Sequence, residues 1–90
     1  MNSQQMVERG RSHTALRSEL ARQGLLQANE HALLLDAADA LLFDEPDALV
    51  KRAQAMDLLD ILEVNGRRSE REAERLRGVL AGCGEAELAS

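Results

Sequence analysis

Residues 32–43 constrain the fold more than any other segment, because ten of these twelve residues are Ala, Leu or Phe. Asp36 and Asp39 are the two exceptions, and on a helix they share one narrow polar stripe with Asn29. The leucines spread around the rest of the circumference. A helix that is apolar on most sides needs neighbours on more than one side, so we expect residues 25–43 to form the central helix of the protein.

The composition favours helix throughout the chain. Sixteen Leu and fourteen Ala make up one third of the 90 residues, and Phe43 is the only aromatic residue. Leu and Ala are strong helix formers, whereas strands are enriched in aromatic and β-branched residues. The sequence therefore predicts an all-α fold. We expect a single domain over residues 1–90, built as a small antiparallel bundle of three to four helices with short turns.

Start and stop signals divide the remaining chain into helices. The acidic residues and Pro at 44–47 have the chemistry of a helix start, and Asn-Gly at 65–66 has that of a helix end. Ser69 and Glu72 have the spacing of a capping box, in which each side chain accepts a hydrogen bond from the other residue's backbone. The sequence predicts helices over residues 12–23, 47–64 and 69–82, with residues 1–11 as a flexible arm and residues 84–90 as a tail. If the first helix starts earlier, Met6, Gly10 and His13 extend the stripe of Leu16 and Leu20.

Helices 25–43 and 47–64 carry more apolar surface than a bundle of 90 residues has neighbours to cover. The sequence therefore predicts a homodimer, or binding to another protein. We expect the core to continue into that interface through seven apolar residues, which are Leu33, Leu34, Leu41, Leu42, Leu49, Met56 and Leu59.

The net charge of −5 is unevenly distributed along the chain. Residues 1–22 carry +2, residues 23–66 carry −7 and residues 67–90 are neutral. An acidic middle opposes binding to a phosphate backbone, so nucleic acid is a disfavoured partner. Asp57, Asp60 and Glu63 form an acidic ridge that has two interpretations: a solvated helix face, or a docking ridge for a basic partner.

No residue pattern in the chain indicates catalysis or cofactor binding. His13 and His31 lack a second ligand at a metal-binding spacing, and no Glu is followed three residues later by His. Cys83 lies on the apolar side of the last helix, where burial as a small hydrophobic residue is favoured over a nucleophilic role. We expect no enzymatic activity, no metal, no cofactor and no small-molecule substrate.

A single cysteine fits a reducing compartment better than an oxidising one, in which disulfide bonds staple small domains. The N-terminus lacks the basic and then apolar pattern of a signal peptide. No stretch approaches the roughly 20 apolar residues of a membrane span. The sequence thus predicts a cytoplasmic protein without a membrane partner.

The Leu-rich run Leu33–Leu42 with its acidic spacers, followed by the helix Asp47–Leu62, is similar in layout to the small helical chaperones of flagellar and type III export systems. The resemblance covers about half of the chain and consists of composition and helix order. It implies an acidic, dimer-forming protein without enzymatic activity, and it assigns no functional residues.

Two function classes follow from these patterns. We expect a non-enzymatic protein-binding module, a cytoplasmic adaptor, chaperone or regulatory antagonist, that offers an apolar groove with an acidic rim to a helix of its target. The alternative is a nucleic-acid-linked regulator, either a DNA-binding dimer that uses the edge Arg67–Arg77 or an acidic mimic of DNA. A helix-turn-helix around Gly66 is disfavoured, because Asn65, Arg67 and Glu72 would occupy positions that normally hold buried apolar residues.

Overall fold

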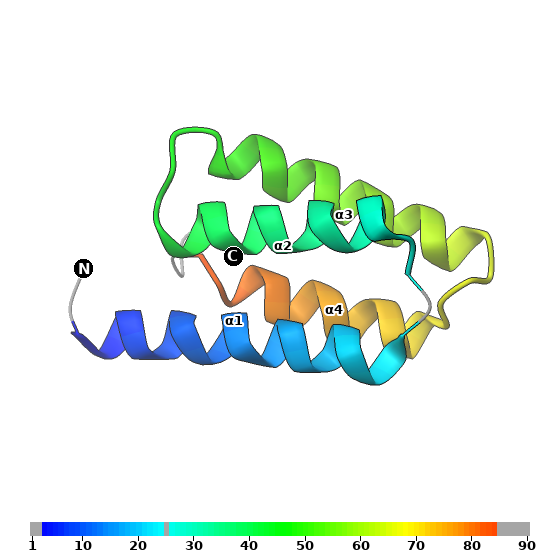
Figure 1. Ribbon diagram of the computed structural model, residues 1–90, viewed down its shortest axis with the longest axis horizontal. Helices are drawn as coiled ribbons and strands as arrows, with labels where there is room; N and C mark the ends of the chain where they lie inside the picture. The colour runs from blue at the N-terminus through cyan, green and yellow to red at the C-terminus, as the bar shows by residue number, and fades with distance from the viewer. Residues whose placement is uncertain (1–2, 25, 85–90) are drawn as a thin grey trace.

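The computed structural model describes residues 3–24 and 26–84, with side chains from Met6 onward. It contains four α-helices: α1 (Ser3–Gln23), α2 (Ala28–Leu42), α3 (Ala48–Val64) and α4 (Glu70–Ala81). Consecutive helices run in opposite directions and pack side by side (Figure 1). The described residues contain no strand, so the expected all-α fold is confirmed.

Helix α2 occupies the central position that its sequence predicts, because it contacts all three other helices. Ala37, Ala38 and Ala40 of this helix are fully buried, and their short side chains let the neighbouring helix axes approach closely. Leucines from all four helices fill the rest of the core without an aromatic residue. The most deeply buried leucines are Leu16, Leu34, Leu41, Leu59, Leu62, Leu76 and Leu80.

The end of α3 and the start of α4 lie where their capping signals predict them, whereas the side chain of Asp47, at the N-cap of α3, accepts no capping hydrogen bond. Ser69 Oγ accepts a hydrogen bond from Glu72 N at 3.1 Å, and Glu72 Oε1 accepts one from Ser69 N at 3.0 Å. This reciprocal pair starts α4 at Glu70. Gly66 follows α3 with a φ of 75°, a conformation that glycine adopts without strain and that closes the helix.

Helix α1 differs from expectation, because it begins at Ser3 and so includes residues 3–11, which were expected to form an arm. The polar residues and Gly10 of this segment give little apolar periodicity from which to predict a helix. Of the predicted tail 84–90, Gly84 is described, while residues 85–90 lie outside the described part of the chain, as does Leu25.

Arg9 anchors the first half of α1 to one end of the bundle, where α2 and α4 both finish (Figure 1). Its side chain is 3% exposed. It donates hydrogen bonds to Cys83 O and Asp44 Oδ1, each at 2.9 Å, and to Leu41 O. A cation at a helix C-terminus is favourable, because the carbonyl groups there carry partial negative charge. Arg9 therefore ties two helix ends to α1.

Arg68 has the matching role at the opposite end of the bundle, where α1 and α3 finish. This buried side chain donates hydrogen bonds to Gly24 O, and to Arg67 O at 2.9 Å. It thus joins the connection between α1 and α2 to the turn between α3 and α4.

The close approach of α4 to α1 predicts opposite effects for two glycine substitutions. A Cβ atom at Gly82 would overlap Ser12 Oγ and lie 3.0 Å from Ser12 Cβ, whereas one at Gly78 would meet no atom within 4 Å. Gly82→Ala should therefore lower the free energy of unfolding by about 1–3 kcal/mol. Gly78→Ala should raise it by about 1 kcal/mol, since Ala is the better helix former. Urea unfolding followed by circular dichroism measures both, and shifts of the same sign would contradict this packing.

Candidate protein-binding surface

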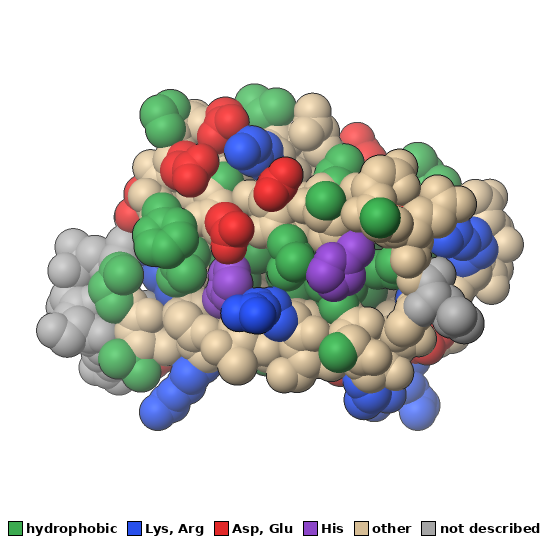
Figure 2. Space-filling model, in the orientation of Figure 1, with side chains coloured by type: hydrophobic (Ala, Val, Ile, Leu, Met, Phe, Trp, Pro, Cys, Tyr) green, Lys and Arg blue, Asp and Glu red, His purple; other side chains and the backbone are tan. Residues whose placement is uncertain are grey.

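Helix α3 carries most of the exposed bulky hydrophobic side chains of the described chain. Leu49, Val50, Ile61 and Val64 are between 54% and 86% exposed. Figure 2 shows hydrophobic side chains at intervals along the upper edge of the molecule, where α3 runs. Three further exposed residues of this kind lie outside α3, and they are Met6, Val7 and Phe43. Apolar side chains gathered on one exposed helix are typical of a binding surface for another macromolecule.

Three of the exposed hydrophobic residues of α3, Val50, Ile61 and Val64, are spaced so that they lie opposite the core side of the helix. Val50, Asp57, Ile61 and Val64 follow one another at intervals of seven, four and three residues, so they share one helical face with Gln54. We call these five residues the α3 outer face. The buried face of the same helix consists of Ala55, Leu59 and Leu62, together with Ala48 at its start.

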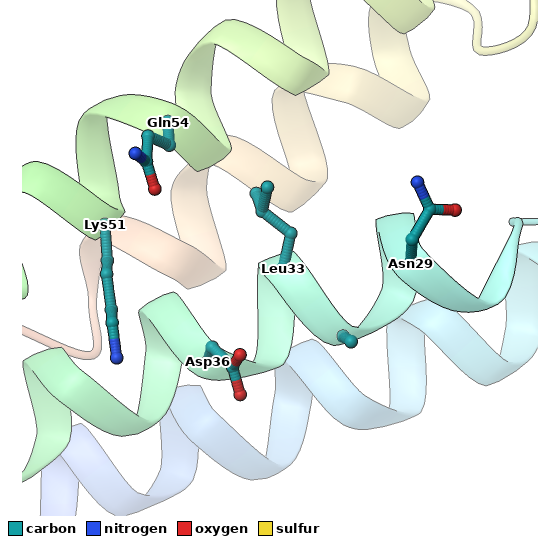
Figure 3. A pocket seen from close by; sticks show the side chains of 6 residues that line it. Asn29, Leu33, Asp36, Lys51 and Gln54 are labelled. Carbon is teal, nitrogen blue, oxygen red and sulfur yellow. The ribbon is translucent and has the colours of Figure 1, made fainter.

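A groove of about 300 Å³ lies between α2 and α3, beside the α3 outer face. Its lining consists of Asn29, Ala32, Leu33 and Asp36 from α2, and Lys51 and Gln54 from α3. In Figure 3, Leu33 points from α2 toward α3, with Asp36 and Lys51 on one side of it and Asn29 on the other. Gln54 belongs to both the groove and the α3 outer face, so the two form one continuous surface. An apolar centre with polar edges suits the docking of an amphipathic helix.

The structure divides the seven apolar residues expected at the interface into two groups. The first group belongs to the core of the single chain and consists of Leu34, Leu41 and Leu59, each at most 1% exposed. The second group keeps accessible surface and consists of Leu33, Leu42, Leu49 and Met56. The first group forms the core part of the expected set, because Leu34 and Leu41 lie on the side of α2 that packs against its neighbours and Leu59 lies on the buried face of α3. Contact of the second group with a partner stays a prediction.

The three carboxylates of the expected acidic ridge do not act as one unit. Arg77 of α4 donates hydrogen bonds to Glu63 Oε1 and Asp60 Oδ1, both at 2.7 Å. These contacts raise the pKa of Arg77 further above its usual value, so the guanidinium group stays charged. Asp57 is exposed and forms no ion pair with any described residue. Asp60 and Glu63 therefore join α3 to α4, and Asp57 is the member of the ridge that remains available to a partner.

The basic edge Arg67–Arg77 contains five arginines, of which three are used within the chain. These three are Arg67, which binds Glu30, Arg68, which binds Gly24 O, and Arg77, which binds Asp60, Glu63 and Glu74. Arg71 and Arg75 remain exposed. A nucleic acid would have to compete with these intramolecular partners for most of the edge, which weakens the hypothesis of a DNA-binding edge.

The contact between Glu30 and Arg67 makes stability depend on pH. Arg67 donates to both carboxylate oxygens at 2.8 Å, and this holds the pKa of Glu30 below its usual value of 4.5. A carboxyl group with a lowered pKa stabilises the folded state above its usual pKa, and this contribution is lost as the pH falls through the lowered value. In Glu30→Gln the free energy of unfolding should therefore fall less steeply below a pH of about 4.5 than in the wild type.

Urea unfolding at a series of pH values measures that slope. Glu8→Gln is the matched control, because Glu8 is an exposed residue of α1, and this variant should keep the wild-type slope. An unchanged slope in Glu30→Gln would show that the ion pair does not contribute to stability.

Of the other polar groups considered as catalytic candidates, His13 and Cys83 are packed inside the bundle, whereas His31 is exposed. His13 Nε2 lies 2.5 Å from Asp39 Oδ1 and links α1 to α2. Cys83 is fully buried, and burial raises the pKa of its thiol to about 11. Such a thiol is protonated at neutral pH and is a poor nucleophile. Within residues 3–24 and 26–84, no three His, Cys, Asp or Glu side chains are grouped so that they could hold a metal ion.

None of the four described helices combines the length and the apolar content that a membrane crossing requires. The surface features of the described residues are the groove, the α3 outer face and the charged groups. The chain was compared with protein-family models, with curated proteins and with solved structures, and it matches none of them.

Proposed function

We propose that the protein is a cytoplasmic protein-binding module without enzymatic activity, an adaptor, chaperone or regulatory antagonist. It binds a helix of its partner in the groove between α2 and α3 and against the α3 outer face. One observation carries this proposal: Gln54 belongs both to the groove and to the helical face of α3 that exposes Val50, Ile61 and Val64, so the groove and this face adjoin. The cytoplasmic location is supported by the single free cysteine, Cys83.

The residues of this surface have the spacing that helix docking uses. Val50, Gln54, Asp57 and Ile61 follow one another along one face of α3 at intervals of four, three and four residues, and Gln54 also lines the groove. A partner helix laid along this face contacts them with its own side chains at intervals of three and four residues. Full burial of a Val or Ile side chain contributes about 1.5–3 kcal/mol, and Val50 and Ile61 keep a little over half of their surface to be buried, so each offers about 1–2 kcal/mol against the cost of association.

Site-specific photo-crosslinking in the native cells tests the proposal. The photoreactive residue p-benzoylphenylalanine replaces Ile61 or Val64 in one set of variants. In the matched control set it replaces Ser18 on the exposed side of α1, or Arg71 on the exposed side of α4. We expect an adduct of the same discrete mass from both α3 positions and none from the control positions.

The pattern of labelling, and not the recovery of an adduct alone, decides the result. Equal labelling from all four positions would mean that contacts with α3 are nonspecific. The absence of an adduct at both Ile61 and Val64 would contradict the proposal directly.

A further inference from the structure

The carboxylates of the acidic segment 23–66 differ in whether a base within the chain pairs with them. This segment contains nine acidic residues, and seven of them form ion pairs with described residues. The pairs are Glu30 with Arg67, Asp39 with His13, Asp44 with Arg9, Glu45 and Asp47 with Lys51, and Asp60 and Glu63 with Arg77. Asp36 and Asp57 form no such pair with the described residues.

These two unpaired carboxylates flank the proposed binding surface. Asp36 lines the α2 side of the groove, as Figure 3 shows, and Asp57 lies on the α3 outer face. Leu33 and Gln54 of the groove lie between them, as does Ile61 of the α3 outer face. Lys51 also lines the groove, and its ammonium group is paired with Glu45 and Asp47. Both carboxylates are exposed. A helix docked in the groove therefore has one negative charge on each side of its apolar ridge.

We infer that the occupant of this surface is an amphipathic helix of another protein that carries Lys or Arg on both sides of its apolar ridge. This inference rests on the proposed function and specifies the partner. A base on each side of the ridge meets Asp36 or Asp57, which have no competing partner among the described residues. A second copy that used the same face would bring like charges together, which opposes association. Charge complementarity thus favours a basic partner helix over self-association.

Two synthetic peptides test the inference with purified protein. They share one apolar ridge of Leu and Ala at helical spacing, and they differ in that one carries Lys and the other Glu on both flanks. Calorimetric titration at low salt should show that the Lys-flanked peptide binds about five- to twentyfold more tightly. The difference should shrink at high salt and in the double variant Asp36→Asn/Asp57→Asn, because it arises from two exposed charge pairs.

Two further variants separate this inference from the proposed function. Ile61→Arg places a charge on the α3 outer face and should abolish binding of the Lys-flanked peptide, whereas Ser18→Arg on α1 should leave it unchanged.

Equal affinity for both peptides, lost in Ile61→Arg, would overturn the charge inference and keep the groove as the binding site. Absence of binding by both peptides would overturn both. A wild-type dimer in light scattering that Ile61→Arg dissociates would identify a second copy as the occupant and overturn the inference.

Discussion

Replacement of Arg9 by Met should lower the free energy of unfolding by about 2–4 kcal/mol. Met keeps most of the buried aliphatic volume of the side chain and removes its donors. Leu41 O and Cys83 O, at the ends of α2 and α4, then lose a charged donor in a buried setting. Asp44 also loses its partner, although this carboxylate is half-exposed and water replaces part of that interaction. Urea unfolding followed by circular dichroism measures the change.

Arg11→Met is the matched control, because Arg11 is an exposed residue of the same helix. This substitution should change the free energy of unfolding by less than about 0.5 kcal/mol. Arg9→Lys should have an intermediate effect, since one ammonium group cannot reproduce the planar set of donors that spans both helix ends. Equal stability of Arg9→Met and Arg11→Met would show that the hydrogen bonds of Arg9 do not stabilise the packing of α1 on the bundle.

Leu59→Ala should lower the free energy of unfolding by about 2–5 kcal/mol, whereas Leu49→Ala should lower it by less than about 0.5 kcal/mol. Both residues were expected at an interface. The structure buries Leu59 completely within the single chain and leaves Leu49 55% exposed. Removal of a fully buried leucine leaves a cavity, while truncation of an exposed one removes few contacts. The same urea titration compares the two variants.

A large loss of stability in Leu49→Ala would mean that this residue is covered in the folded protein. A small loss in Leu59→Ala would contradict the packing of α3 against the core. Either result would reverse the assignment of core and surface on this helix.

The sequence predicts α3 and α4 well because their ends depend on local chemistry. The capping box of Ser69 and Glu72 and the turn at Gly66 are formed by residues close together in the chain. The all-α fold class can also be predicted from the sequence, since it follows from the Leu and Ala content. Periodicity also shows that α3 is apolar on two sides, and the structure uses one of them for the core.

The remaining features depend on contacts between distant residues. The first half of α1 is anchored by Arg9, whose partners follow 32 and 74 residues later. The sequence of this segment alone offers only the weak stripe of Met6, Gly10 and His13. Glu30 and Arg67 are 37 residues apart, and nothing in the sequence around either residue predicts that the two form an ion pair. Helix α2 is apolar on most sides, so periodicity alone cannot tell which leucines face the core. For the same reason Leu34 and Leu41 were expected at the interface.

The exposure of the α3 outer face in the folded protein, on which the proposed binding surface depends, is tested most directly by the double variant Ile61→Lys/Val64→Lys. Urea unfolding should give a free energy within about 0.5 kcal/mol of the wild type, because both side chains face solvent in the folded chain. A loss of about 2 kcal/mol or more would contradict this exposure, since the two side chains would then be buried in the folded protein, within the chain or in an obligate oligomer.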